Sequence, residues 1–184
     1  MTGNRNVISF PDNLNIKFSG IDSMRLHEHG QAIFIHLTFD EYLNSIESSF
    51  LINQILEKGM LDFQLTDFMF NKVKGFHGPF KSNLLNDSDY QLIDNHEFFD
   101  SLTKIILKER KNTPKISDDL EEALMTKIKL ISKKETEFFV LKKELSNEPK
   151  KFEHEWTHAL TEYYEFLILN YSSNNIFSLL LAYD

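Results

Sequence analysis

The sequence predicts an α+β fold with a strand-rich N-terminal half that contains one helix, a helical C-terminal half and a closing C-terminal strand. Two observations carry this prediction. Apolar side chains alternate with period two in parts of the first half, as in half-buried strands, and recur every three or four residues in much of the second half, as in helices. The two patterns follow one another along the chain, which is typical of α+β folds and not of parallel βαβ units.

The expected strands of the first half are short apolar segments bounded by glycine or proline. They span residues 7–10, 14–18, 31–37 and 60–66. Between the last two, Thr38 and Glu41 have the spacing of a capping box, which predicts a helix over residues 38–58. Gly59 follows as a residue type that commonly ends helices. Residues 71–89 are rich in Gly, Asn and Asp and are expected to form loops.

Three helices are expected in the second half. Asn95 and Ser117 can cap the first two, and Pro149 suits the first turn of the third. The predicted helices span residues 95–111, 117–145 and 149–171. The polar run 172–175 ends the last of them, and the apolar segment 176–181 predicts the closing strand.

Length and composition indicate one globular domain over residues 1–184. The chain is 41% hydrophobic and 26% charged, and it is long enough to bury a core without crosslinks. It contains no cysteine, which excludes disulfides and thiolate zinc sites. The N-terminal residues lack the apolar core of a signal peptide, and no apolar run is long enough to span a bilayer. The expected location is therefore the cytoplasm.

The chain carries a net charge of −8, and most of that charge lies in its first half. Residues 1–100 hold 7 Lys and Arg against 14 Asp and Glu, which gives −7, whereas residues 101–184 hold 13 against 14, which gives −1. An acidic chain is repelled by nucleic acid and anionic membranes and is attracted to basic proteins. The expected partner is therefore another protein of basic character, and the oligomeric state stays open.

Aromatic and acidic residues around the predicted loop form the candidate partner-binding set. An aromatic side chain beside a loop is less often part of the core than one on a strand or helix. Exposed aromatic side chains are typical of protein interfaces. The aromatic members of the set are Phe68, Phe70, Phe76 and Phe80. The acidic members are Asp62, Asp67, Asp87 and Asp89.

In general profile, a compact acidic chain of this kind resembles bacterial immunity proteins that neutralise a cognate toxin. The resemblance rests on size and charge and not on a residue motif. It implies a non-catalytic binding module without a cofactor, whose acidic face covers the basic active site of a nuclease-like toxin and speeds association.

An H-E-x-x-H pattern formed by His154, Glu155 and His158 supports an alternative function. Residues at i and i+4 share a helix face, so both imidazoles can bind one Zn²⁺ while the glutamate activates the metal-bound water. The run HEWTHALTEY resembles the zinc helix of thermolysin-like metallopeptidases, which implies ligands at His154 and His158 and a base at Glu155. That family's third ligand falls at Ser178 here, so Asp184 is the substitute candidate. The alternative is thus a zinc-dependent hydrolase or peptidase.

A second interpretation of the same pattern needs no metal. If residues 149–171 form one helix, His154, His158 and Glu165 lie opposite its apolar stripe. They then belong to a solvated helix face, with a contact between His158 and Glu165 two turns apart.

Overall fold

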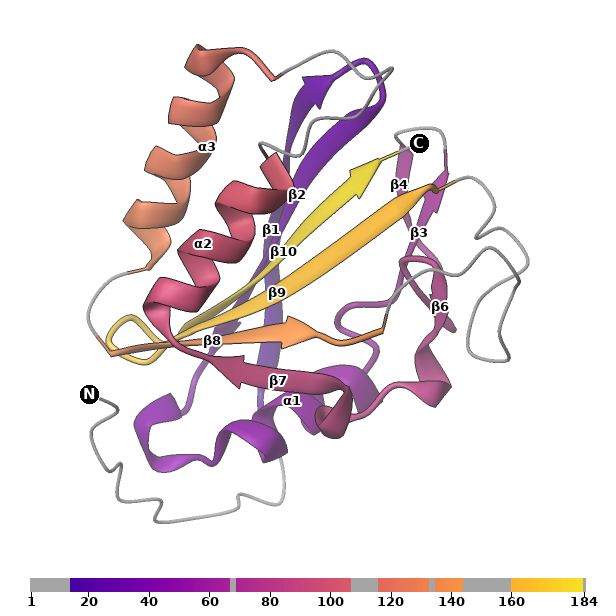
Figure 1. Ribbon diagram of the computed structural model, residues 1–184. Helices are drawn as coiled ribbons and strands as arrows, with labels where there is room; N and C mark the ends of the chain where they lie inside the picture. The colour runs from indigo at the N-terminus through magenta and orange to yellow at the C-terminus, as the bar shows by residue number, and fades with distance from the viewer. Residues whose placement is uncertain (1–13, 67–68, 107–115, 133–134, 144–159, 184) are drawn as a thin grey trace.

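The computed structural model describes residues 14–66, 69–106, 116–132, 135–143 and 160–183. A six-stranded sheet runs through the whole molecule, and every neighbouring pair of strands in it is antiparallel (Figure 1). The strand order is β1-β2-β10-β9-β8-β7, so the N-terminal hairpin lies beside the C-terminal strand. The strands are β1 (Ile16–His27), β2 (Gly30–Phe39), β7 (Tyr90–Ile93), β8 (Thr136–Leu141), β9 (Glu162–Asn170) and β10 (Asn175–Tyr183).

The central strands are covered on both sides. Every residue from Glu165 to Asn170 in β9 is buried, and so is every residue from Ser178 to Tyr183 in β10. Successive side chains of a strand point to opposite faces of the sheet, so continuous burial requires packing against both faces. Two separate hydrophobic cores result, one on each face.

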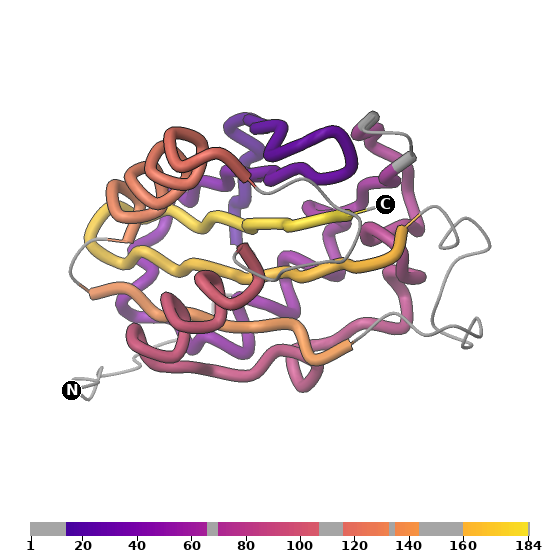
Figure 2. Tube along the Cα trace, turned by 45° about the horizontal axis from the view of Figure 1, so that its top comes forward, coloured from indigo at the N-terminus to yellow at the C-terminus, as the bar shows by residue number. Residues whose placement is uncertain are grey.

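Two antiparallel helices cover the first face, and Figure 2 shows them crossing in front of the strands. They are α2 (Asn95–Ile106) and α3 (Asp118–Ile131). The Ser117 side chain accepts a hydrogen bond from the backbone N–H of Leu120, as a capping residue does. Aromatic packing dominates this core, because the Phe98 ring stacks on Phe138 at 4.3 Å and meets Phe166 edge-on at 5.2 Å.

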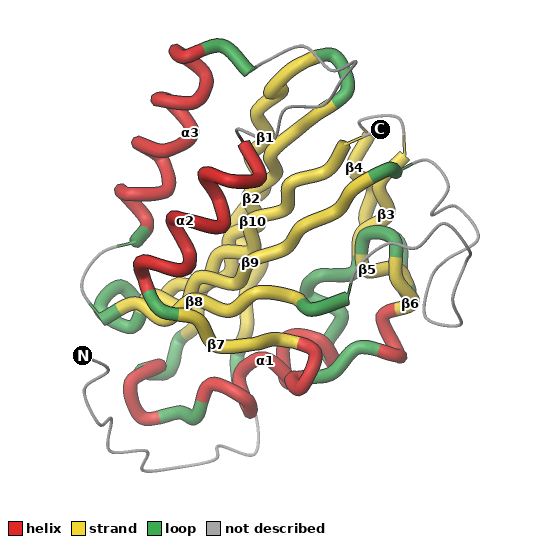
Figure 3. Tube along the Cα trace, in the orientation of Figure 1, coloured by secondary structure: helices red, strands yellow, loops and turns green. Residues whose placement is uncertain are grey.

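The second face is covered by less regular structure (Figure 3). Helix α1 (Ser48–Glu57) packs there through Leu51, Ile52 and Ile55. A four-stranded sheet of order β4-β3-β5-β6 packs beside it, and β3 is parallel to β5 while the other two pairs are antiparallel. Its strands are β3 (Phe63–Thr66), β4 (Met69–Lys72), β5 (Phe76–His77) and β6 (Phe80–Lys81). Short 3₁₀ helices lie at Leu43–Ser45, Ser82–Leu84 and Asp87–Asp89.

The expected helical C-terminal half is wrong, because the second half of the chain supplies three strands of the main sheet. Residues 136–141, expected as the end of a helix, form β8, and residues 162–170 form β9 in place of the end of the helix predicted over 149–171. A strand buried on both faces is apolar without alternation, and a short run of that kind does not differ in pattern from a buried helix. The closing strand is present as β10.

The helix expected over residues 38–58 is shorter than predicted and begins later. Thr38 and Phe39 belong to β2, where Thr38 pairs with Lys17 on one side and Asn175 on the other. Helix α1 begins only at Ser48, and the Glu47 side chain caps it by accepting from the N–H of Phe50. Pairing on both edges therefore overrides the capping-box signal, since tertiary hydrogen bonds outweigh local propensity.

Some expectations concern residues beyond those described. The strand predicted over residues 7–10 and the helical residues 107–111 lie outside the described segments. In the described part of the chain, no helix is long and apolar enough to cross a lipid bilayer.

Candidate functional site

A buried polar cluster lies where β5, β7, β9 and β10 meet. The carboxylate of Glu165 accepts hydrogen bonds from His77 Nε2 at 2.6 Å, from Tyr163 OH at 2.8 Å and from Tyr90 OH at 3.0 Å. Ser178 Oγ lies 3.3 Å from the same carboxylate. These five residues, here called the Glu165 cluster, are at most 6% exposed, and Glu165 itself is completely buried. A charged group at that depth is tolerated only with several hydrogen-bonding partners.

A tight turn brings His77 against the main sheet. Gly78 follows His77 with φ +56°, and a Cβ there would lie 2.7 Å from the ring of Tyr163. Only glycine fits both requirements, since it alone adopts positive φ without strain and has no side chain to clash. The N–H of Gly78 donates to the Phe63 carbonyl at 2.8 Å, which anchors the turn to β3.

The surroundings of Glu165 favour its ionised form. Burial alone raises the pKa of this carboxyl, but the adjacent His77 imidazole and the hydroxyls of Tyr163 and Tyr90 lower it by more, so the net pKa lies below its ordinary value. The pKa values of both tyrosines are raised well above the ordinary value, by burial first and by the nearby carboxylate second. The cluster therefore holds a carboxylate hydrogen-bonded to two neutral phenols.

The proton of the histidine is assigned to the nitrogen that faces the carboxylate. Nε2 of His77 lies 2.6 Å from Glu165, so Nε2 is the donor, and Nδ1 has no hydrogen-bond partner among the described groups. An imidazole beside a carboxylate has the composition of a general-base pair. Here every member is enclosed, so the arrangement ties four strands together and does not offer the pair to a substrate.

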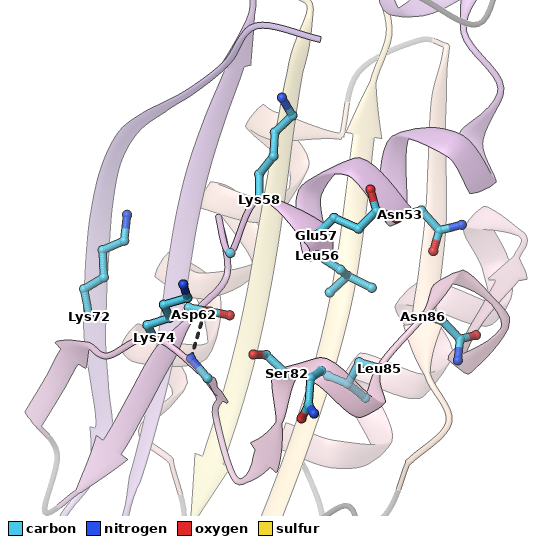
Figure 4. A pocket seen from close by; sticks show the side chains of 13 residues that line it. Asn53, Leu56, Glu57, Lys58, Asp62, Lys72, Lys74, Ser82, Leu85 and Asn86 are labelled. Atoms are coloured by element: carbon cyan, nitrogen blue, oxygen red, sulfur yellow. Dashed lines mark hydrogen bonds between the residues drawn. The ribbon is translucent and has the colours of Figure 1, made fainter. Parts of the chain in front are cut away.

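A concave surface lies between α1 and the small sheet. It is a pocket of about 710 Å³ whose wall includes the stretches 53–62, 72–75 and 82–86 (Figure 4). The stretch 71–89, expected to be loop, thus supplies half of the pocket wall, although β5, β6 and two 3₁₀ turns organise it.

The predicted aromatic residues occupy different environments. Phe80 is completely buried and meets the Tyr163 ring edge-on, so it belongs to the core. Phe70 is half-buried and stacks on Phe63 at 4.3 Å, and Phe76 is half-buried in β5. Phe68 lies outside the described residues. The described aromatic side chains do not gather into one exposed patch, and their role in partner binding stays a prediction.

The predicted acidic residues also separate. Asp62 is buried in the pocket wall, where its carboxylate accepts from the N–H of Gly75 at 2.9 Å. Asp87 accepts from the Asn53 amide, and Asp89 pairs with Lys143 at 2.7 Å. Asp67 is not among the described residues. Asp87 and Asp89 precede the edge strand β7, and Asp87 adjoins the pocket wall through Asn53.

The residues of the zinc hypothesis lie outside the described segments. They are His154, Glu155, His158 and Asp184. Two of its neighbours are described: Glu165 lies in strand β9 and accepts a hydrogen bond from His77 of β5, and Ser178 belongs to the Glu165 cluster. Within the described ranges, no group of three or more His, Asp or Glu side chains is arranged to hold a metal ion. The zinc-dependent hydrolase stays an untested alternative.

Comparison of this chain with protein-family models, with curated proteins and with solved structures found no match.

Sequence reasoning did not identify the Glu165 cluster as a unit. One signal was present, because Glu165 is the only charged residue between Tyr163 and Asn170, a run that is otherwise almost wholly apolar. A charge in a buried run needs a buried partner. The partners come from positions 77, 90 and 178, and no local pattern connects these to residue 165.

Proposed function

We propose that this protein is a non-catalytic binding module that captures a basic protein, in the manner of bacterial immunity proteins that neutralise a cognate toxin. The observation that carries the proposal is an acidic surface along β7 and the start of α2. Between Lys81 and Lys104 the chain has no Lys or Arg and has five acidic residues. They are Asp87, Asp89, Asp94, Glu97 and Asp100, here called the acidic segment.

Hydrogen bonds hold much of the acidic segment in place before any partner arrives. Asp94 accepts from the backbone N–H of Glu97 at 2.8 Å, and the Glu97 carboxylate accepts from the N–H of Asp94 at 3.1 Å. Asp89 and Asp100 pair with Lys143 and Lys104, so two of the five charges have a cationic neighbour. The remaining charge stays available to attract a basic surface, and fixed carboxylates lose little entropy on binding.

The edge strand β7 adds an exposed apolar side chain to the acidic segment. In the described residues β7 pairs only with β8, and Leu92 in its middle is 49% exposed. Interfaces combine an apolar centre with a charged rim, and the rim charges raise the association rate. The proposed partner is therefore a protein with a basic surface that docks over β7, and the cytoplasm is the proposed location.

Charge reversal tests the proposal. Immobilised protein is used to capture partners from cells of its source, and the Glu97→Lys/Asp100→Lys variant is compared with wild type; the Asp94 cap is left intact. A captured protein is identified, purified and titrated by calorimetry. We expect a basic partner whose affinity falls at least about tenfold in the variant, which corresponds to about 1.4 kcal/mol.

A matched control reverses two exposed carboxylates elsewhere, Glu28→Lys/Glu122→Lys, and changes net charge by the same amount. It is expected to bind nearly as wild type does. Equal losses in both variants would reduce the effect to net charge, and an acidic partner, or one unaffected by either variant, would contradict the proposal. Near-stoichiometric zinc in the purified protein, lost in His154→Ala/His158→Ala, would favour the hydrolase instead.

A further inference from the structure

We propose that the pocket between α1 and the small sheet binds a phosphorylated small molecule. This site adjoins the acidic segment only at Asp87, through Asn53, and the inference goes beyond the proposed function. Its carrying observation is that Lys58, Lys72 and Lys74 all line one pocket in a chain whose net charge is −8.

The three lysines come from two separate parts of the fold. Lys58 follows the end of α1, whereas Lys72 ends β4 and Lys74 follows in the next turn. Figure 4 shows Lys72 and Lys74 on the left and Lys58 above them. All three are exposed, and none makes an ion pair with a carboxylate of the described chain. Like charges on one pocket wall repel each other, and a bound anion reduces that repulsion.

The two carboxylates of the pocket wall are already engaged. Asp62 is 7% exposed and accepts from the N–H of Gly75 at 2.9 Å, and Glu57 accepts from the Gln54 amide at 3.0 Å. Neither one pairs with a lysine of the pocket. The three lysines therefore outnumber the two carboxylates of the wall, and Lys72 also lies over the Phe18 ring, with Nζ 5.9 Å from the ring centroid.

The opposite wall offers groups that recognise an uncharged part of a ligand. Asn86 and Leu85 lie there beside Asn53, and Ser82 lies at the base of the view in Figure 4. Amide and hydroxyl side chains bind sugar hydroxyls, and an apolar side chain packs against a carbon skeleton. A pocket of about 710 Å³ lies within the usual range for organic ligands.

These features select the ligand class. The ammonium groups of Lys58, Lys72 and Lys74 outnumber the carboxylates of Glu57 and Asp62 on this wall, which favours an anionic ligand, and lysine acts on phosphate as a mobile point charge. A phosphoryl group carries about two negative charges near neutral pH and offers three acceptor oxygens. A sugar phosphate has both the charge for the lysine side and the hydroxyls for the amide side.

Titration calorimetry with ribose 5-phosphate, ribose and inorganic pyrophosphate tests the proposal. We expect saturable binding of ribose 5-phosphate with one site per chain and no detectable binding of ribose. If pyrophosphate binds with an affinity similar to that of ribose 5-phosphate, the lysines account for the recognition. If pyrophosphate binds more weakly, the asparagine side chains of the opposite wall contribute to the affinity for ribose 5-phosphate. Lys58→Gln/Lys72→Gln/Lys74→Gln should weaken ribose 5-phosphate binding at least about tenfold.

The control removes three exposed lysines elsewhere, Lys104→Gln/Lys129→Gln/Lys142→Gln, and matches the change in net charge. It should keep the wild-type affinity, and circular dichroism should show both variants folded. Absence of saturable binding to either phosphate, or equal weakening in the two variants, would overturn the proposal. Neither result bears on the acidic segment, so this inference and the proposed function fail separately.

Discussion

The two faces of the six-stranded sheet are covered in different ways. On one face, two regular helices pack through apolar side chains such as Phe98 and Leu124, both completely buried. On the other, short strands and turns enclose the Glu165 cluster and border the pocket. The first face is held by apolar packing with polar contacts of α3 to the sheet, such as the Lys127–Asp22 pair and the Asn170 amide that donates to the Ile131 carbonyl. The second is held by packing together with a buried charge.

The two faces also differ in the polar features that they enclose. A core of interlocked apolar groups is a scaffold, whereas a buried charge, a turn with positive φ and a concave polar surface are features that proteins maintain for a specific geometry. All three occur on the second face, at Glu165, at Gly78 and in the pocket. The following predictions test the contrast, from the largest expected effect to the smallest.

Glu165→Ala should lower the free energy of unfolding by about 4 kcal/mol, because it leaves the buried donors of His77, Tyr90 and Tyr163 without their acceptor. Urea denaturation followed by circular dichroism measures the change. Glu162→Ala removes the same side chain from the partly exposed start of the strand and should cost less than about 1 kcal/mol. Similar losses at the two positions would contradict the role of the cluster.

Leu124→Ala should lower the free energy of unfolding by about 3 kcal/mol, through lost apolar burial and the cavity left behind. Leu130→Ala changes the same residue type on the same helix, where the side chain is 64% exposed, and should cost less than about 0.5 kcal/mol. The same denaturation experiment decides this. Equal effects would mean that α3 is not packed on the sheet as described.

The pH dependence of stability should separate the faces. The pKa of Glu165 is lower in the folded state, so its contribution is present above the unfolded pKa of about 4.3 and is lost as pH falls through the folded pKa. Glu165→Gln should therefore flatten the acid limb of the curve, whereas Leu124→Ala should displace the whole curve and keep its shape. A Glu165→Gln curve parallel to wild type would show that this carboxyl does not govern the acid limb.

Ser117→Ala should lower the free energy of unfolding by about 1 kcal/mol, because the N–H of Leu120 loses its cap. Ser117→Asp keeps an acceptor at the same position and should retain nearly full stability, as thermal unfolding can show. An equal loss in both variants would indicate a packing role for the hydroxyl.

Local sequence signals predicted the helices whose start is marked by neighbouring residues in the sequence. Ser117, followed by acidic residues, marked the start of α3. Helix α2 begins at Asn95, but its cap is Asp94 and not Asn95 as predicted, because Asp94 accepts from the N–H of Glu97. β9 escaped prediction because its residues are apolar on both faces, and β8 because no breaker separates it clearly from the preceding helix. Only pairing with neighbouring strands decides between helix and strand for such segments.

The candidate sites also divide into those that the local sequence shows and those that distant segments form. The acidic segment is visible in the sequence, because its charges are contiguous along the chain. The Glu165 cluster joins residues 77, 90, 163, 165 and 178, and the pocket joins the end of α1 to the small sheet. Such sites arise from contacts between distant segments and leave little local trace.

By itself, the sequence determined the charge of this protein, its helix starts at Asn95 and Ser117, its closing strand and its acidic segment, because each depends on neighbouring residues. The tertiary structure alone decided that β9 is a strand, that β2 extends through Phe39, and that Glu165 meets His77 and the two tyrosines. Those outcomes depend on long-range hydrogen bonds and burial, whose free energies exceed local preference and act between residues far apart in the chain.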